Sequence, residues 1–201
     1  MSAAVRVDTP HGPAKAHLRV ADAPKAALVL GHGAGGGVEA RDLVAVAEVA
    51  RTKRVSVALV EQPYRVAGRR SPAPAGQLDM AWTAVVDHLR GAEFAGLPLI
   101  VGGRSLGARV ACRTAAAMQA MAVLCLAFPV HPPGRPEKSR LEELDAVTLP
   151  TLVVQGDRDP FGMPPAASNR EVVQVAGDHG LKKDLDAVAA AVEGWLRRVA
   201  G

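Results

Sequence analysis

The stretch Leu97-Pro-Leu-Ile-Val-Gly-Gly-Arg-Ser-Leu-Gly107 predicts a buried strand that turns directly into a helix. The apolar run from Leu97 to Val101 is short and suits a strand that is buried on both faces. The glycines that follow permit a tight turn at Ser105, which places its hydroxyl at the edge of the sheet. Residues 103–107 have the G-x-S-x-G pattern of a nucleophile elbow, in the strand–turn–helix context that this pattern requires.

A glycine-rich turn with a solvated serine would show the same five residues, so the chemistry depends on partners elsewhere in the chain. The N–H of Leu106 is expected at the N-terminus of the following helix, next to Ser105. There it can stabilise the negative charge that develops on a carbonyl oxygen. A serine hydroxyl also needs a base, and the base needs a group that orients it.

His179 is the candidate base. It lies in Gly177-Asp-His-Gly180, directly after a predicted strand over residues 171–175. Flanking glycines and the absence of an apolar pattern mean that core packing does not explain an imidazole at this position. The alternative, a solvated loop histidine, explains less, because the loop ends on the same edge as Ser105.

Two aspartates compete for the role of the acid. Asp157 and Asp159 both lie in Gly156-Asp-Arg-Asp-Pro160, after another apolar strand. Asp157 follows the turn glycine and is expected to form an Asx turn, whereas Asp159 lies deeper in the loop before a rigid proline. We therefore expect Asp159 to orient His179, which in turn activates Ser105.

Strands and helices alternate along the rest of the chain. The predicted strands cover residues 5–7, 17–20, 26–30, 55–60, 97–101, 122–128, 150–155 and 171–175, and the predicted helices cover residues 39–51, 78–90, 105–118, 139–144 and 181–199. After an opening hairpin, the central strands are continuous apolar runs, which predicts a mostly parallel sheet with helices on both faces, the α/β class. In such sheets the ligand site lies beyond the carboxyl ends of the strands.

Composition narrows the class of protein further. With 201 residues, the chain is expected to form a single domain, residues 1–201, that buries its core without disulfides. Cys112 and Cys125 lie in apolar stretches and are expected to be buried thiols. Aromatic residues make up 3% of the chain, which argues against a nucleic-acid binder that stacks bases.

Cofactor, metal and membrane partners are not expected. No group of His, Cys and Asp residues has the spacing of metal ligands. The first 17 residues lack the apolar region of a signal peptide, and the longest nearly apolar run, residues 120–130, is too short to cross a bilayer. We therefore expect a cytoplasmic protein.

The loop Gly31-His-Gly-Ala-Gly-Gly-Gly37 has two interpretations. In an acyl-transfer site, it would supply a second backbone donor, the N–H of Ala34, while His32 shapes the loop. The same glycines match G-x-G-x-x-G, and Glu61 ends the next strand, as in a dinucleotide site. That alternative leaves Ser105 and the later Asp and His loops unexplained.

Four side chains are expected to contact a substrate: Tyr64, Arg65, Arg104 and Phe161. Tyr64 and Arg65 follow a strand on the candidate edge and would wall or clamp an acidic acyl group, although a solvated basic loop explains them equally well. Arg104 lies inside the elbow, and Phe161 is expected on the apolar side of the pocket.

The chain resembles the α/β-hydrolase superfamily in four motifs, which occur in this order: the Gly-His-Gly loop, the elbow, the Gly-Asp-Arg-Asp-Pro loop and Asp178-His179-Gly180. The small size is most similar to the dienelactone-hydrolase-like proteins and other compact members, and the resemblance extends over residues 26–199. It implies that Ser105 is the nucleophile, His179 the base and Asp159 the acid. The same resemblance makes the N–H groups of Ala34 and Leu106 the oxyanion hole.

Two departures from the family pattern bear on the substrate. Dienelactone hydrolases proper carry cysteine at the elbow, where this chain has Ser105. Larger members insert a cap domain after the strand that corresponds to residues 122–128, and here only residues 129–149 are available. The resemblance therefore implies an α/β-hydrolase fold with no large cap domain and an open site.

The expected function is a serine hydrolase that cleaves a small-molecule carboxylic ester or thioester through an acyl-enzyme intermediate. A non-catalytic interaction module that keeps the fold is the first alternative, because a fold does not establish turnover. A dinucleotide-binding enzyme that uses the loop from Gly31 to Gly36 is the second.

Overall fold

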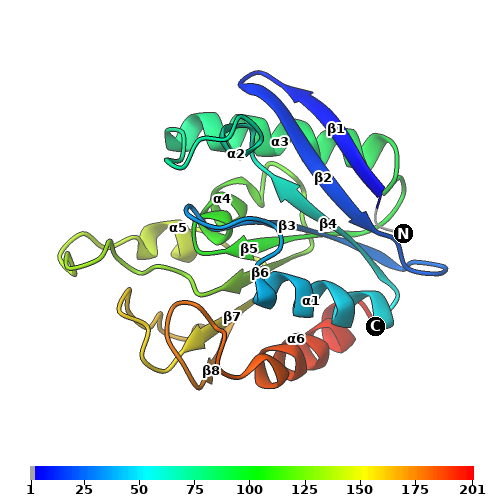
Figure 1. Cartoon of the computed structure of the whole chain (residues 1–201). Coiled ribbons are helices and arrows are strands. Elements are labelled where there is room, and N and C mark those ends of the chain that lie inside the picture. Colours follow the sequence, from blue (N-terminus) through cyan, green and yellow to red (C-terminus); the bar gives the residue numbers. More distant parts are fainter. Residues whose placement is uncertain (1–2) are drawn as a thin grey trace.

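The computed structural model describes residues 3–201, which form an eight-stranded sheet covered by helices (Figure 1). The strands are β1 (Ala3–Thr9), β2 (Gly12–Arg19), β3 (Ala26–Gly31), β4 (Val55–Glu61), β5 (Leu99–Arg104), β6 (Ala122–Leu126), β7 (Thr151–Gly156) and β8 (Arg170–Val175). Their order in the sheet is β1-β2-β4-β3-β5-β6-β7-β8. The β1–β2 and β2–β4 pairs are antiparallel and all the other pairs are parallel, which confirms the predicted hairpin and mostly parallel sheet.

Helices cover both faces of the sheet, as the alternating pattern predicts. They are α1 (Arg41–Thr52), α2 (Pro63–Val66), α3 (Ala75–Gly91), α4 (Leu106–Thr114), α5 (Leu141–Asp145) and α6 (Leu185–Val199). α1 and α6 pack side by side on one face, and the other helices lie on the opposite face (Figure 1). No cap domain is inserted between β6 and β7, where only α5 and its loops lie.

Each central strand contributes side chains to two hydrophobic cores, one on each face of the sheet. In β3, Leu28 and Leu30 pack toward α1 and α6, whereas Ala27 and Val29 pack toward α3 and α4. All six residues of this strand are buried, which explains why the sequence shows a continuous apolar run rather than alternation. Burial of such aliphatic surface contributes roughly 25 cal/mol per Å², and it fixes the strand ends that carry the candidate site.

Several element boundaries differ from the predictions; for example, α4 ends at Thr114 rather than at residue 118. Two of the differences have a clear physical reason. Residues 61–76, predicted as a loop, contain the short helix α2, which begins at Pro63, because proline is favoured at the first helical position. The last helix begins at Leu185 rather than Leu181, because the Asp184 carboxylate caps it by accepting a hydrogen bond from the Ala187 N–H at 2.9 Å.

Cys112 and Cys125 are buried free thiols with their sulfur atoms 3.6 Å apart, which confirms that prediction. Among residues 3–201, no helix is long and apolar enough to span a bilayer.

Candidate active site

The turn after β5 holds Ser105 in a strained conformation. Its φ and ψ are 51° and −106°, outside the regions that non-glycine residues favour, at a cost of roughly 1–3 kcal/mol. The Ser105 N–H donates to the Leu126 carbonyl at 2.9 Å, which ties the turn to the end of β6. The side chain stands at the carboxyl edge of the sheet, where the sequence predicted it.

The glycines of the elbow allow close backbone packing. A Cβ atom on Gly107 would lie 2.3 Å from the Gly31 carbonyl oxygen, and one on Gly103 would lie 2.6 Å from the same atom. Any side chain at either position would therefore push α4 away from β3. This contact gives the G-x-S-x-G pattern its physical reason in this chain, as the sequence analysis expected.

The predicted nucleophile, base and acid meet within hydrogen-bonding distance. Nε2 of His179 lies 2.9 Å from Oγ of Ser105, and Nδ1 lies 2.8 Å from Oδ2 of Asp159. An ionised Asp159 only accepts, so Nδ1 carries the ring proton and Nε2 is free to accept the Ser105 hydroxyl proton. Residues separated by more than 70 positions along the chain are thus brought together at one edge.

Protein donors hold the Asp159 carboxylate in place. Its side chain is fully buried, and Oδ1 accepts from the Phe161 N–H at 2.8 Å. Oδ2 accepts from Nε2 of Gln155 at 2.9 Å, in addition to His179. Sequence analysis missed Gln155. The signal was a polar residue near the end of an otherwise apolar strand, where a buried amide needs a partner.

The competing aspartate has a different place. Oδ1 of Asp157 accepts from the Gly177 N–H at 2.8 Å, so this side chain joins the acid loop to the histidine loop. The structure therefore brings Asp159, and not Asp157, to His179. The Phe161 ring packs against the imidazole, with centroids 4.1 Å apart and planes inclined by 31°.

The glycine-rich loop after β3 passes beside the candidate nucleophile. A Cβ atom on Gly33 would lie 3.7 Å from Cβ of Ser105. Within the described residues, neither the Ala34 N–H nor the Leu106 N–H donates to a protein acceptor. Both amides therefore remain available to a ligand oxygen, as the predicted oxyanion hole requires.

His32 shapes this loop from a buried position. Its Nδ1 donates to the Gly33 carbonyl at 2.8 Å, and its Nε2 accepts from the Gln62 N–H at 3.2 Å. The ring is 2% exposed, and burial lowers the pKa of His32, which keeps it neutral and able to accept from Gln62. The loop is thus connected to the start of α2 by a buried imidazole.

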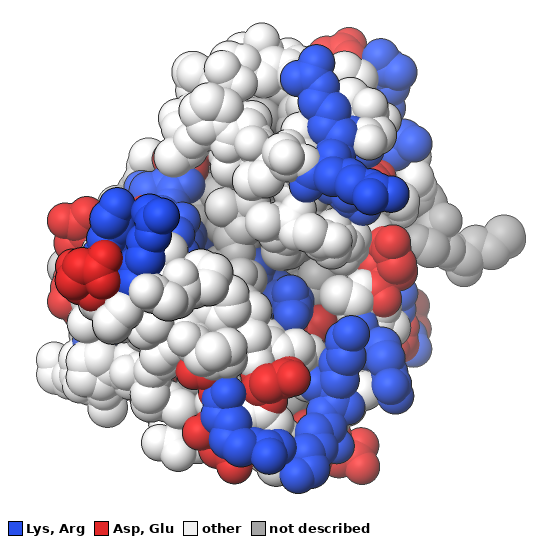
Figure 2. Space-filling view, turned by 60° about the vertical axis from the view of Figure 1, so that its left-hand side comes forward, with Lys and Arg blue, Asp and Glu red and all other residues white. Residues whose placement is uncertain are grey.

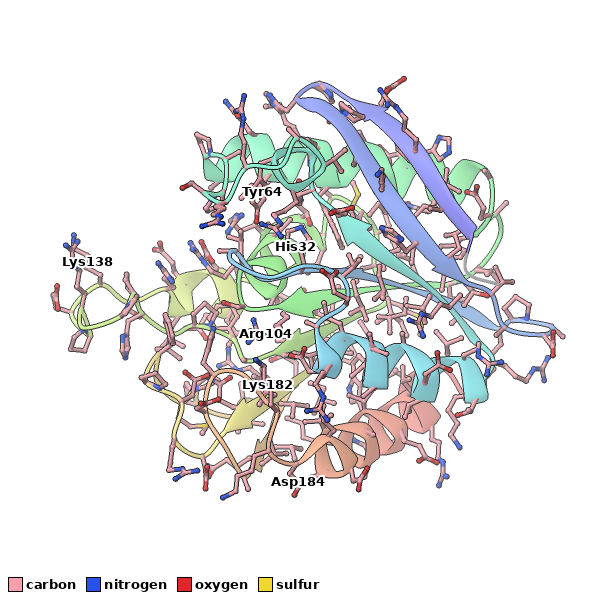
Figure 3. The ribbon with its side chains drawn as sticks, in the orientation of Figure 1. His32, Tyr64, Arg104, Lys138, Lys182 and Asp184 are labelled. Atoms are coloured by element: carbon pink, nitrogen blue, oxygen red, sulfur yellow. The ribbon has the colours of Figure 1, made fainter. Side chains whose placement is uncertain are left out.

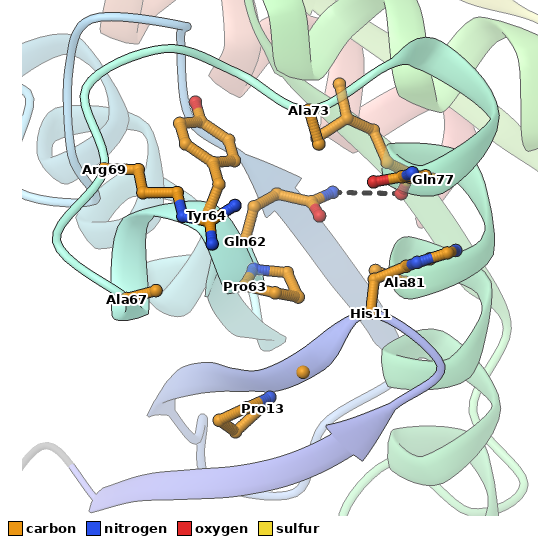
Figure 4. A pocket seen from close by; sticks show the side chains of 12 residues that line it. His11, Pro13, Gln62, Pro63, Tyr64, Ala67, Arg69, Ala73, Gln77 and Ala81 are labelled. Carbon is orange, nitrogen blue, oxygen red and sulfur yellow. Dashed lines mark hydrogen bonds between the residues drawn. The ribbon is translucent and has the colours of Figure 1, made fainter.

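Tyr64 supports the same loop instead of lying open to a substrate. Its side chain is buried, and its hydroxyl donates to the Ala34 carbonyl at 3.0 Å. Burial raises the pKa of Tyr64 to about 12, so the hydroxyl remains a donor at neutral pH. Tyr64 also lines a cavity of about 120 Å³, together with Gln62 and Pro63 (Figure 4). Tyr64 therefore reaches the candidate site only through the backbone of Ala34.

The two arginines predicted to contact substrate differ in their partners. Arg65 is partly exposed, and its side chain forms no ion pair or hydrogen bond with the described residues. Arg104 is engaged by the protein: Nε lies 2.9 Å from Oδ2 of Asp42, and Nη2 donates to the His179 carbonyl at 2.9 Å. Figure 3 shows Arg104 at the centre of this edge.

A cleft of about 440 Å³ opens beside the elbow and the histidine loop. Its lining residues are Gly35, Gly36, Gly37, Glu39, Ala40, Arg41, Asp42, Arg104, Gly180 and Lys182. Figure 2 turns this edge forward and shows Lys and Arg side chains on both sides of a central hollow. The cleft reaches the surface directly, in agreement with the missing cap domain.

The features of the dinucleotide alternative have other partners in the fold. Glu61 lies 3.6 Å from Nε2 of His17 on the hairpin. A Cβ atom on Gly31 would lie 3.1 Å from Cα of Gly107, so this glycine is explained by helix packing. Within residues 3–201, no group of three or more His, Cys, Asp or Glu residues could hold a metal ion.

Comparison with known families identifies the class of protein. The model of the alpha/beta hydrolase domain family matches residues 24–187, so the chain belongs to this family. The superfamily that the sequence motifs resemble is thereby confirmed.

Solved structures agree with this assignment. The fold is similar to a serine hydrolase without a lid from Xanthomonas campestris, at 21% identity and a TM-score of 0.79 over 98% of this chain and 94% of that one. Est1E from Butyrivibrio proteoclasticus has 19% identity and a TM-score of 0.80 over 98% of each chain. A dienelactone hydrolase from Anabaena variabilis has 19% identity and a TM-score of 0.80 over 100% and 99% of the two chains. At these identities, the likeness shows the fold alone.

Proposed function

We propose that the protein is a serine hydrolase that cleaves carboxylic esters or thioesters through an acyl-enzyme formed on Ser105. The hydrogen-bonded series Ser105–His179–Asp159, with distances of 2.9 and 2.8 Å, carries the proposal. Membership in the alpha/beta hydrolase domain family supports hydrolysis, and so does the fold shared with the serine hydrolase from Xanthomonas campestris.

In the first half-reaction, Oγ of Ser105 attacks the acyl carbonyl carbon while Nε2 of His179 takes the hydroxyl proton. Asp159 stabilises the imidazolium that forms and keeps the ring oriented. The N–H groups of Ala34 and Leu106 bind the tetrahedral oxyanion. When the intermediate collapses, the bond to the alcohol or thiol breaks, and His179 returns its proton to the leaving group.

In the second half-reaction, water attacks the acyl-enzyme by the same route. His179 removes a proton from the water, and the second tetrahedral intermediate releases a carboxylic acid and the Ser105 hydroxyl. His179 returns this proton to Oγ of Ser105 as the second intermediate collapses, so the two half-reactions together consume one water molecule and restore the protein.

Two of the four side chains predicted from the sequence remain candidates for direct substrate contact. Arg65 has an unpaired guanidinium near the glycine-rich loop and would hold an acidic acyl group. Phe161 packs on the base and would form an apolar wall beside the reacting carbonyl. Tyr64 and Arg104 instead hold the backbone of the site, because they donate hydrogen bonds to the carbonyls of Ala34 and His179.

A fluorophosphonate probe tests the proposal directly, since it phosphonylates an activated serine without a known substrate. We expect stoichiometric labelling of the native protein, loss of labelling in Ser105→Ala, and unchanged labelling in a control, Ser71→Ala, at an exposed loop position. A folded native protein that stays unlabelled would favour the non-catalytic alternative.

A further inference from the structure

We propose that Arg104 is a positioning residue that fixes the base and the oxyanion loop relative to Ser105, with Asp42 as its buried anchor. The proposal rests on the proposed function insofar as these groups act on an acyl substrate. The sequence predicted that Arg104 contacts a substrate. In the structure, its guanidinium instead contacts Asp42 and the His179 carbonyl.

One guanidinium reaches three segments of the site. Arg104 directly precedes Ser105 in the elbow. Its Nη2 donates to the carbonyl of His179 at 2.9 Å, so it holds the backbone that carries the imidazole. A Cβ atom on Gly33 would lie 2.8 Å from Nη1, so the guanidinium packs against the residue before Ala34. The nucleophile, the base and one oxyanion donor therefore share a single neighbour.

The bond to the His179 carbonyl restrains the backbone of the histidine loop at the residue that carries the imidazole. Among the described residues, Arg104 is the only donor to this carbonyl oxygen. The Gly180 and Leu181 amides instead turn back to Asp178. The bonded carbonyl oxygen is two covalent bonds from the Cα of His179, so loss of the guanidinium would let the backbone that carries the imidazole move. A displacement of about 1 Å at a reacting group can reduce a rate about 100-fold.

Asp42 explains why the guanidinium stays in place. Its carboxylate, in the first turn of α1, is 1% exposed and lies 2.9 Å from Nε of Arg104, while the arginine side chain is 17% exposed. The adjoining cleft of about 440 Å³ gives the side chain room to swing toward solvent. The buried counter-charge removes that freedom, because an ionised Asp42 left without Arg104 would be a buried unpaired charge.

The pair also gives a physical reason for the residue types at these positions. A lysine at residue 104 would present one point charge, whereas the fork of the guanidinium forms an ion pair with Asp42 and at the same time donates a hydrogen bond to the His179 carbonyl. A side chain at Gly33 would occupy the space that Nη1 fills. Arg104, Asp42 and Gly33 thus form one unit, although they belong to three different elements.

The test compares Arg104→Ala, Arg104→Lys and Asp42→Asn with the native protein by the second-order rate of fluorophosphonate labelling at Ser105. We expect a decrease of about 10- to 100-fold for Arg104→Ala, and little recovery in Arg104→Lys. Millimolar guanidinium, far below denaturing concentrations, should restore part of the rate in Arg104→Ala. Asp42→Asn combined with Arg104→Ala should be no worse than Arg104→Ala alone, because the two residues act together.

The matched control is Arg109→Ala. Arg109 is also a partly buried arginine near Ser105, and it forms two hydrogen bonds with Glu143 at 2.7 and 2.6 Å, away from the histidine loop. This variant loses an equivalent ion pair and should label at the native rate, with no response to guanidinium. A similar decrease in both variants would reduce Arg104 to a general stabilising residue and overturn the proposal.

Hydrogen exchange separates this proposal from the proposed function, because it needs no acyl chemistry. In Arg104→Ala, the amides of residues 176–183 and 32–37 should exchange faster, and in Arg109→Ala they should not. Faster exchange together with an unlabelled native protein would support the positioning role and reject the hydrolase. Native-like exchange and labelling in Arg104→Ala would reject the positioning role and leave the hydrolase intact.

Discussion

The two sides of Ser105 are built differently. On one side, the His179 side chain contacts Oγ of Ser105 at 2.9 Å, and the Asp159 side chain contacts His179 at 2.8 Å. On the other side, the candidate donors are backbone amides, and Tyr64 and His32 hold their loop from behind. Under the proposed mechanism, a substitution on the first side removes a group that takes part in proton transfer or orients the base, whereas a substitution on the second side only displaces a backbone donor. The two sides should therefore differ strongly in their sensitivity to mutation.

The largest effect should come from the acid. Asp159→Asn reverses a hydrogen-bonding atom next to Nδ1 of His179, favours the wrong ring tautomer, and should reduce the hydrolysis of an activated ester by about 10³- to 10⁴-fold. Asp157→Asn should reduce it less than about 10-fold, since that residue contacts Gly177 and not the base. Steady-state kinetics with the two variants side by side measures the contrast. Equal losses would show that both aspartates support the loop and that neither serves the base alone.

On the oxyanion side, Tyr64→Phe should have an intermediate effect. It removes one hydrogen bond to the Ala34 carbonyl, worth about 1 kcal/mol, and leaves the buried ring in place. We expect kcat to decrease about 5- to 10-fold with KM nearly unchanged, because the loop meets the substrate mainly in the transition state. A change confined to KM would instead place the Tyr64 hydroxyl in direct contact with the substrate.

Removal of the unpaired charge of Arg65 should have a smaller effect on the rate. Arg65→Ala should lower kcat/KM for an activated hemisuccinate ester by about 3- to 10-fold, and leave a neutral butyrate ester of similar length unchanged. Added salt should reduce the difference, since a partly exposed charge is screened over about 10 Å. Lys25→Ala, at the opposite end of β3, is the control. A loss of the same size with the neutral ester would argue against an acidic acyl group.

The smallest effect concerns stability rather than rate. Burial lowers the pKa of His32 below its usual 6.5. Between the lowered pKa and 6.5, His32 is therefore protonated in the unfolded chain and neutral in the folded protein. The contribution of His32 to the free energy of unfolding should be constant above pH 6.5. It should decrease as the pH drops from 6.5 toward the lowered pKa. Melting temperatures between pH 7.5 and 5 should therefore decrease less steeply in His32→Asn than in the native protein. His88→Asn, at an exposed position of α3, should keep the native slope, and equal slopes in all three proteins would contradict the expectation.

Residues with a local sequence signature could be predicted from the sequence, whereas residues that depend on remote partners could not. Ser105, Asp159 and His179 each follow a strand and stand near glycine or proline, so local pattern and chain order were enough to predict that they meet. The roles of Asp42, Gln62 and Gln155 depend on partners that are remote or buried. A buried Asp in the first turn of a helix, or a Gln near a strand end, has no local signature until the fold supplies its partner.

Helix α2 was missed for a related reason. Four residues beginning with Pro63 give too short a window for helical periodicity, and three prolines between residues 61 and 76 favour a loop by composition. Tertiary contacts decide the conformation here: Gln62 binds His32, and Tyr64 binds the Ala34 carbonyl. The mostly parallel sheet, in contrast, was predictable from the alternating pattern of strands and apolar runs. Its order was not, because β4 lies between β2 and β3 and thus departs from chain order.

The short connection between β6 and α5 has a consequence for the fate of an acyl-enzyme. Residues 133–139 in this connection are exposed, and Figure 3 shows Lys138 at its outer tip, far from Arg104. An acyl group on Ser105 would therefore face bulk water, at a concentration that competing alcohols or amines rarely match. Such a site favours hydrolysis over transfer to another acceptor, and its product can diffuse away without waiting for a gate to open.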